Sequence, residues 1–182
     1  MLKPQDLLVG CALGVGIPNG YEPLAAGIGL SLSSTHDAVR RLLRAGLVSR
    51  ARELNVPQFV ELIEHGARYV WPLESAGKGR GLPTGSAAPM FRDSDDFPDV
   101  GDAPMVWALA GAHPLSVAGI VVQPLYPSAP AAAAANRDLY AALALVDGAR
   151  VAGNARERAA SVRALRAHFA RLTARGGPRA SA

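Results

Sequence analysis

Residues 21–48 read YEPLAAGIGLSLSSTHDAVRRLLRAGLV, a pattern that predicts two helices joined by a tight turn. The first helix is short and apolar and ends at Gly29, a residue that readily adopts the positive φ needed between two steeply crossed helices. Ser31 follows at the position where a side-chain oxygen caps the free amides of the next helix. In that helix Val39 and Leu42 lie on one side, and arginines lie largely on the other. A helix that is apolar inward and basic outward is shaped to enter the major groove of DNA.

The same residues resemble the DNA-reading unit of bacterial winged helix-turn-helix regulators of the MarR-like kind. The resemblance rests on LAAxIGLS at residues 24–31, VxxL at residues 39–42 and AGLV at residues 45–48, and it covers about residues 3–50. In that family the Gly-Leu-Ser turn precedes the recognition helix, and Ala-Gly-Leu-Val leads into the first strand of the wing. The resemblance implies sequence-specific binding to double-stranded DNA, usually as a homodimer, and does not name a small-molecule effector.

The outer side of the second helix supplies the expected DNA contacts. Arg40 is the best candidate for a bidentate contact with guanine. Asp37 is expected either to accept a hydrogen bond from cytosine N4 or to orient Arg40. Phosphate contacts, which set affinity rather than sequence preference, are expected from Arg41, Arg44 and Arg50. The residues expected on or near the groove-facing side are Ser33, Ser34, His36, Asp37, Arg40, Arg41 and Arg44, and Arg50 completes the predicted DNA contacts. The alternative is an ordinary amphipathic helix whose arginines only face solvent.

The segment after residue 50 departs from an ordinary winged domain. The pattern predicts no immediate hairpin but a helix over residues 56–65 and then a strand over residues 68–72. We therefore expect the wing to be displaced to about residues 74–81, where Lys78 and Arg80 of a glycine-rich loop would lie near a minor groove or phosphates. A linker with incidental charge is the alternative interpretation of this loop.

The second half of the chain predicts a small hairpin followed by helices, so the fold class is α+β. Residues 1–92 are expected to form the winged helix-turn-helix domain and residues 93–175 a region for dimerisation or sensing, with residues 176–182 disordered. The predicted hairpin joins strands at residues 105–110 and 117–123. The last helix, about residues 155–173, carries an apolar stripe at a three-four-three spacing, which is typical of a helix that faces a partner. The stripe consists of Val162, Leu165, Phe169 and Leu172. We expect it to form a homodimer interface, and simple packing on its own domain is the alternative.

Composition restricts the compartment and the partners. An apolar content of 49% supports a packed core, and no run of residues is long and apolar enough to span a membrane. The chain starts with no signal-peptide pattern and has one cysteine, Cys11, so we expect a cytoplasmic protein without disulfides. Positive charge is concentrated in the first half and after residue 149, while the middle is acidic; this suggests two surfaces that attract polyanions.

Catalysis is poorly supported by the sequence. Cys11 lies on an apolar stripe, as a small core residue does. The four histidines are scattered and show no metal-ligand spacing: His36, His65, His113 and His168. We therefore predict no enzyme activity, no cofactor and no metal.

These observations predict a DNA-binding transcriptional regulator, expected to be a repressor, that reads the major groove with residues 33–45. Its predicted partners are double-stranded DNA and a second copy of itself. The alternative is a non-catalytic protein-interaction module, antitoxin-like or an accessory subunit, built on the same winged-helix fold.

Overall fold

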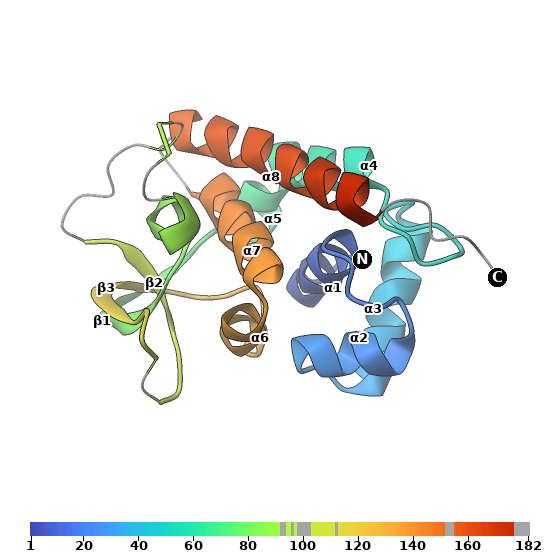
Figure 1. Cartoon of the computed structure of the whole chain (residues 1–182), viewed down its shortest axis with the longest axis horizontal. Helices are drawn as coiled ribbons and strands as arrows, with labels where there is room; N and C mark the ends of the chain where they lie inside the picture. The colour runs from blue at the N-terminus through green and yellow to red at the C-terminus, as the bar shows by residue number, and fades with distance from the viewer. Residues whose placement is uncertain (92–93, 96, 98–102, 112, 152–154, 177–182) are drawn as a thin grey trace.

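The computed structural model of the 182-residue chain describes residues 1–91, 94–95, 97, 103–111, 113–151 and 155–176. The protein is a mixed α+β structure, as the sequence predicts, with mostly helical elements and a sheet of three strands. Figure 1 shows the strands at the left and the first three helices at the right, with α6 and α7 between them and α8 and α4 across the top.

The first three helices follow the predicted pattern. They are α1 (Pro4–Gly14), α2 (Tyr21–Ile28) and α3 (Leu32–Arg44). The turn between α2 and α3 is confirmed: Gly29 has a φ of 65°, and the Ser31 hydroxyl oxygen accepts a hydrogen bond from the Ser34 amide at 3.1 Å. Val39 and Leu42 are buried, so the inner side of α3 is also as predicted.

Directly after α3 the chain turns back on itself, so the prediction that no immediate hairpin follows residue 50 is wrong. Val48 and Leu54 form an antiparallel bridge, and the Ser49 amide donates to the Glu53 carbonyl oxygen at 2.9 Å. We call residues 48–54 the short hairpin. Its turn contains no glycine, proline or asparagine; Arg52 itself adopts a positive φ of 61°. Such a conformation is uncommon outside glycine, so the sequence pattern gave no sign of this turn.

The predicted fourth helix is confirmed and extends further than expected. After α4 (Val56–Leu62) the chain continues through a π-helical turn, η1 (Ile63–Ala67), into one more helical turn, α5 (Arg68–Val70). The strand predicted over residues 68–72 is therefore wrong. In a strand Tyr69 and Trp71 would share a face, but Tyr69 is exposed and Trp71 is buried.

The strands close on themselves at one end of the molecule. They are β1 (Ser75–Pro83), β2 (Met105–Ala108) and β3 (Val117–Val122). β1 pairs antiparallel with both of the others, and β2 pairs with β3 in parallel, with Met105 opposite Ile120. The two strands predicted in the second half are thus confirmed, but their pairing as an antiparallel hairpin is wrong.

Two glycines allow the strands to approach so closely. A side chain at Gly81 would place its Cβ 1.9 Å from the carbonyl oxygen of Trp107, and one at Gly119 would place it 2.1 Å from that of Pro104. Residues 77–81, predicted as a flexible loop, therefore belong to a paired strand in which glycine serves close packing.

The C-terminal helices form the centre of the molecule. They are α6 (Ala129–Ala135), α7 (Arg137–Arg150) and α8 (Ala155–Gly176). Every residue of α7 from Leu139 onward is buried. One cluster of buried side chains runs through both predicted domains, and in it the rings of Phe59 on α4 and Phe169 on α8 lie 6.2 Å apart. The predicted disordered tail, residues 176–182, lies outside the described residues except for its first residue.

The apolar stripe of α8 packs inside its own chain. Val162, Leu165 and Phe169 are at most 5% exposed, and only Leu172 is partly exposed. The stripe lies where α8 meets α7 and α4. We therefore correct the role predicted for the stripe Val162, Leu165, Phe169 and Leu172: the first three fill the core and do not offer a surface to a second copy, and Leu172 alone keeps partial exposure. Among the described residues, no helix combines the length and apolar character needed to cross a membrane.

Candidate nucleic-acid interface

The outer side of α3 carries polar and basic side chains that reach solvent. The exposed residues are Ser33, His36, Arg40 and Arg44, and Ser34 and Asp37 are partly exposed. Arg40 Nη2 lies 3.0 Å from Asp37 Oδ1, which is one of the two roles predicted for Asp37. Because 58% of the Arg40 side chain and 47% of the Asp37 side chain are exposed, this ion pair is weak and can exchange for another partner.

Arg41 has a structural partner instead. Its Nε and Nη2 donate to the two carboxylate oxygens of Asp6 on α1, at 2.8 and 2.7 Å. Asp6 is fully buried, and only 16% of the Arg41 side chain is exposed. The hydrogen bond to Asp6 raises the pKa of Arg41 above its already high value. The predicted phosphate contact of Arg41 is corrected accordingly, because the two donors that would form a fork on a phosphate already hold α3 against α1.

The short hairpin is tied to the loop between α1 and α2. Arg52 Nε donates to the Asn19 carbonyl oxygen at 2.7 Å, and Asn19 Nδ2 donates to the Ala51 carbonyl oxygen at 2.8 Å. The Arg52 guanidinium also lies 4.8 Å from the centre of the Tyr21 ring. These contacts fix the tip of the hairpin and leave Arg50 exposed there.

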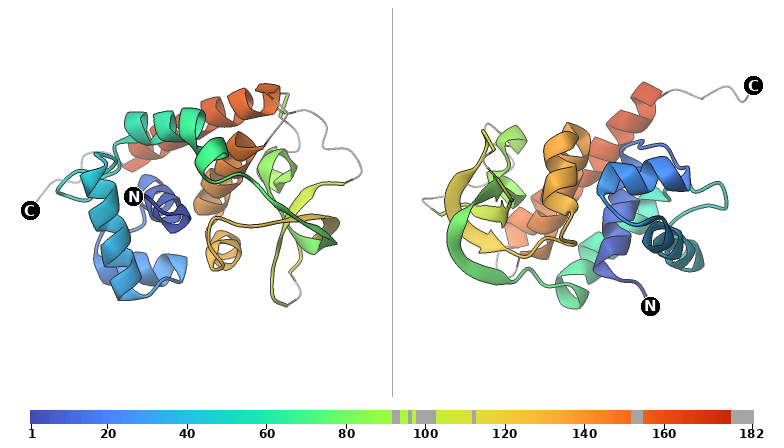
Figure 2. Two further views of the ribbon diagram at one scale, coloured as in Figure 1. Left: turned by 180° about the vertical axis from the view of Figure 1, so that it is seen from behind. Right: turned by 90° about the horizontal axis from the view of Figure 1, so that it is seen from below.

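Tyr21 connects the hairpin to the outer side of α3. Its ring centre lies 4.8 Å from that of His36, so Arg52, Tyr21 and His36 follow one another across a single surface. Figure 2 shows that α2, α3 and the chain that follows α3 gather at the end of the molecule opposite the strands. Asn19, Tyr21 and Arg52 are not among the residues predicted from the sequence, because their contacts depend on a turn in which Arg52 adopts a positive φ.

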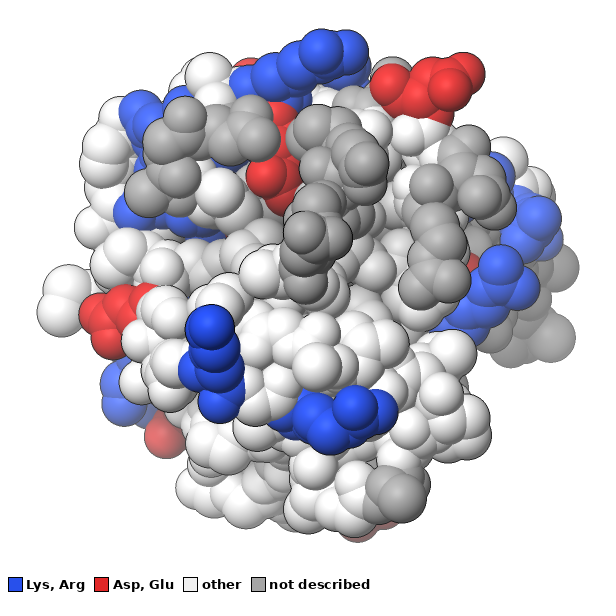
Figure 3. Space-filling view, turned by 90° about the vertical axis from the view of Figure 1, so that its left-hand side faces the viewer, with Lys and Arg blue, Asp and Glu red and all other residues white. Residues whose placement is uncertain are grey.

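The positions of Lys78 and Arg80 contradict the displaced wing. Both are exposed residues of β1, which lies at the end of the molecule away from α3 (Figure 1). Arg80 Nη2 donates to the Ser116 carbonyl oxygen at 3.0 Å, within the strand region. Figure 3 shows the strand-bearing face, on which basic side chains stand apart from one another on mostly uncharged surface. Lys78 and Arg80 therefore do not join the surface made by α3 and the short hairpin.

Asp147 and Cys11 are buried groups that serve packing. The Asp147 carboxylate accepts from Arg150 at 2.6 Å, Trp107 at 2.7 Å and Thr84 at 3.0 Å. Burial raises the pKa of Asp147, and the charge of Arg150 and the donated hydrogen bonds act in the opposite direction. Burial also raises the pKa of the Cys11 thiol far above its usual value, so Cys11 stays a protonated core residue. Within the described residues no group of three or more His, Cys, Asp or Glu side chains is arranged to hold a metal ion.

Comparisons of the chain with protein-family models, with curated proteins and with solved structures found no match.

Proposed function

We propose that the protein is a DNA-binding transcriptional regulator that places α3 in the major groove of double-stranded DNA. The observation that carries the proposal is the outer side of α3, where Ser33, Arg40 and Arg44 are exposed while the opposite side is buried. Arg40 matches guanine O6 and N7 as a bidentate donor, and Asp37 holds its guanidinium outward until a base replaces the carboxylate.

The short hairpin supports the proposal as a small wing beside α3. Its Arg50 is exposed and suited to a phosphate, and its tip is held by Asn19 and Tyr21, so little ordering entropy would be lost on binding. Gly29 and Ser31 set the angle and the start of α3 relative to α2. The surface thus combines a helix for base edges with a rigid loop for the backbone.

Repression by a homodimer is part of the same proposal. Two recognition helices about 34–36 Å apart would read successive major grooves, and a single copy would make only half of the contacts. The dimer surface would have to be other than the α8 stripe, which is buried, and other than the buried side of α1. Mass measurement in solution, with and without an operator duplex, tests this part.

The phosphate contacts are tested by the salt dependence of binding. We expect a labelled duplex from the DNA upstream of the protein's own coding region to bind with an affinity that falls steeply with KCl concentration. The double variant Arg44→Ala/Arg50→Ala should reduce the slope by up to about two units, since each phosphate contact contributes about 0.9. The matched control is Lys78→Ala/Arg80→Ala, which removes the same charge from the opposite end and should leave the slope nearly unchanged. If both double variants reduce the salt slope equally, α3 and the short hairpin are not the surface that contacts DNA.

Base readout is tested by Arg40→Ala. The variant should lose about 1–3 kcal/mol on the preferred duplex and should relax the preference at one base position. Arg44→Ala should weaken all duplexes about equally, because a phosphate contact carries no sequence information. The preferred duplex is first selected from a random library and then measured by fluorescence anisotropy. An Arg40→Ala protein with unchanged affinity and preference would show that α3 does not read DNA.

A protein-interaction module is the second candidate, and one observation favours it. Leu32 and Leu43 on α3 are 51% and 42% exposed, so both present apolar area that another protein chain could cover. The same surface would then cover part of another protein chain. Such a module would show no salt-dependent affinity for any duplex, so the KCl series separates the two candidates.

A further inference from the structure

A cavity of about 730 Å³ lies between α7, α8 and the short 3-10 turn η3 (Pro89–Phe91), away from α2, α3 and the short hairpin. Its size is in the range of small-molecule sites. None of its lining residues contributes to the proposed DNA surface, so ligand binding in this cavity would be independent of DNA binding by α3.

The two helices present different chemistry at the two ends of the cavity. The two helices α7 and α8 run antiparallel. His168 on α8 therefore lies near the start of α7, where it contacts the Asp138 carbonyl oxygen at 3.0 Å. Arg171 and Arg175 therefore lie beside Arg137 at one end. Leu145 follows Arg137 by eight residues and so lies about 12 Å further along α7, at 1.5 Å per residue, and it also lines the cavity.

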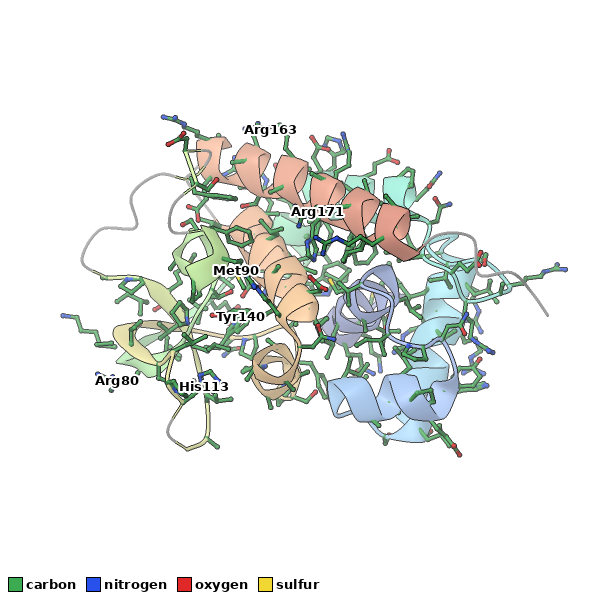
Figure 4. All side chains as sticks on the ribbon, in the orientation of Figure 1. Arg80, Met90, His113, Tyr140, Arg163 and Arg171 are labelled. Carbon is green, nitrogen blue, oxygen red and sulfur yellow. The ribbon has the colours of Figure 1, made fainter. Side chains whose placement is uncertain are left out.

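The apolar lining includes an aromatic pair. The rings of Phe91 and Phe97 lie 5.1 Å apart, and Met90 and Ala164 also line the cavity. Figure 4 shows Met90 on the η3 side of α7 and Arg171 between α8 and α7, whereas Arg163 lies at the opposite edge of α8.

Among the described lining residues, the basic end has an excess of positive charge. Three arginines lie there with one carboxylate, Asp138, and within the described part of the chain none of the three forms an ion pair with a carboxylate. A guanidinium without a carboxylate partner at the mouth of a cavity is suited to a bidentate contact with a carboxylate, sulfonate or phosphate group.

His168 positions one of these arginines. Its Nε2 must donate to the Asp138 carbonyl oxygen, so its Nδ1 is free to accept from Arg171 Nη2 at 2.9 Å. Only the neutral imidazole satisfies both contacts. Burial lowers the pKa of His168, which favours that form. The guanidinium of Arg171 is thus oriented before any ligand enters.

We propose that this cavity binds a small organic anion with an aromatic or aliphatic body. The anionic group would be held by Arg137, Arg171 and Arg175, and the body would pack against Phe91, Phe97 and Leu145. The separation of the basic end from the apolar end selects ligands that carry both features over neutral apolar molecules and over simple inorganic anions.

A pair of dyes that differ in charge tests the proposal on the full chain. 8-Anilino-1-naphthalenesulfonate carries the sulfonate that the arginines would hold, and N-phenyl-1-naphthylamine has a similar body without it. We expect saturable fluorescence enhancement with one sulfonate dye per chain. In Arg171→Gln/Arg175→Gln its affinity should fall by about tenfold or more, because charge-assisted hydrogen bonds are lost. The affinity of the neutral dye should be nearly unchanged.

The control for charge is Arg156→Gln/Arg163→Gln, which removes two exposed arginines from α8 outside the cavity. It should leave the affinity for the sulfonate dye within about twofold, the change expected from long-range electrostatics at moderate salt. An equal loss in both double variants would overturn the proposal, since it would show only a general attraction to a basic helix.

The control for place uses two exposed alanines of α8. Ala167 lines the cavity and Ala170 does not, so Ala167→Leu should block both dyes and Ala170→Leu should block neither. Circular dichroism of each variant excludes dye binding to a partly unfolded chain. If Ala167→Leu binds both dyes like the unchanged protein, the dyes bind elsewhere and the proposal fails.

Discussion

The neighbouring residues Arg40 and Arg41 of α3 have different surroundings, although the sequence predicts a DNA contact for both. Arg40 is largely exposed and paired with Asp37 on its own helix, whereas Arg41 is bound in a fork by the buried carboxylate of Asp6 on α1. An exposed ion pair contributes little to stability, and a buried carboxylate that loses its partner is strongly destabilising. We therefore expect a substitution of Arg40 to change DNA binding and a substitution of Arg41 to change the stability of the fold.

Arg41→Ala should lower the free energy of unfolding by about 2–4 kcal/mol. This is somewhat less than the usual cost of breaking a fully buried pair, because Arg41 keeps some contact with solvent. Urea denaturation measures the change, and Arg44→Ala is the matched control, since Arg44 is exposed and forms no ion pair in the described chain. If Arg41→Ala is as stable as Arg44→Ala, Asp6 has another way to keep its charge solvated, and Arg41 is free for DNA.

At the scale of elements, α7 is held in place by polar groups at both ends. Near its C-terminal end Asp147 accepts hydrogen bonds from Thr84, the residue that follows β1, and from Trp107 of β2, while Arg150 donates to the Trp71 carbonyl oxygen at 2.7 Å. Near its N-terminal end the Tyr140 hydroxyl donates to the Pro83 carbonyl oxygen, and the Asp138 carbonyl oxygen accepts a hydrogen bond from His168 of α8.

Asp147→Ala should lower the free energy of unfolding by about 3–5 kcal/mol, because it leaves the buried guanidinium of Arg150 without its counter-charge. Thr84→Val removes only one hydrogen bond to the same carboxylate and should cost about 1.5–3 kcal/mol. Thermal and urea denaturation of both variants give the comparison. Equal losses would mean that the ion pair adds nothing beyond a single hydrogen bond.

The contact between α7 and α8 should depend on pH through His168. Burial lowers the pKa of His168 in the folded chain, and the charge of Arg171 acts in the same direction, while Asp138 opposes it; Arg137 and Arg175 line the same cavity. The stabilisation by the neutral imidazole is therefore fully present above about pH 6.5, the unfolded-state pKa, and is lost as the pH falls through the lower folded-state pKa.

His168→Gln isolates this dependence, because glutamine can donate to Asp138 and accept from Arg171 but does not titrate. We expect urea midpoints of the unchanged protein to fall below pH 6.5 more steeply than those of the variant. The difference between the two curves cancels the titration of all other groups, which both proteins share. Parallel curves would show that His168 does not change its charge in this range.

For the whole molecule, one core joins the proposed DNA surface to the C-terminal helices. Phe59, which follows the short hairpin in α4, packs against Phe169 of α8, and Gly10 of α1 is so close to Phe59 that an added Cβ would lie 2.3 Å from its ring. The helices α1 and α4, which support the proposed DNA surface, therefore depend on α8 for the burial of their own apolar side chains.

Truncation before Ala155 should abolish cooperative folding of the remaining chain. It removes Val162, Leu165 and Phe169 from the core, and each large side chain contributes roughly 1.5–3 kcal/mol when buried. That sum is a large part of the total stability of an ordinary domain. Analytical gel filtration and thermal denaturation of the truncated chain check the result. A truncated protein that is monomeric and melts cooperatively would show that α8 covers a core able to form without it.

The sequence by itself determined the elements whose signals are local. Gly29 and Ser31 specify the turn between α2 and α3, apolar spacing specifies the buried side of α3, and the i,i+3 spacing of Asp37 and Arg40 brings their side chains together on one helix. The α+β class and the positions of β2 and β3 follow from hydrophobic patterning over a few residues.

Only the tertiary structure decided which distant segments meet. Arg41 and Asp6 are 35 residues apart, and the pairing of β2 with β3 requires β1 to lie antiparallel to both. Arg52 turns the chain at a positive φ in a segment that contains no glycine, proline or asparagine. The α8 stripe has the same periodicity whether it covers a partner or its own core, and the cavity exists only because α7, α8 and η3 come together. The physical reason is that periodicity defines which side of an element must be buried but not what buries it, and that choice depends on contacts between residues far apart in the chain.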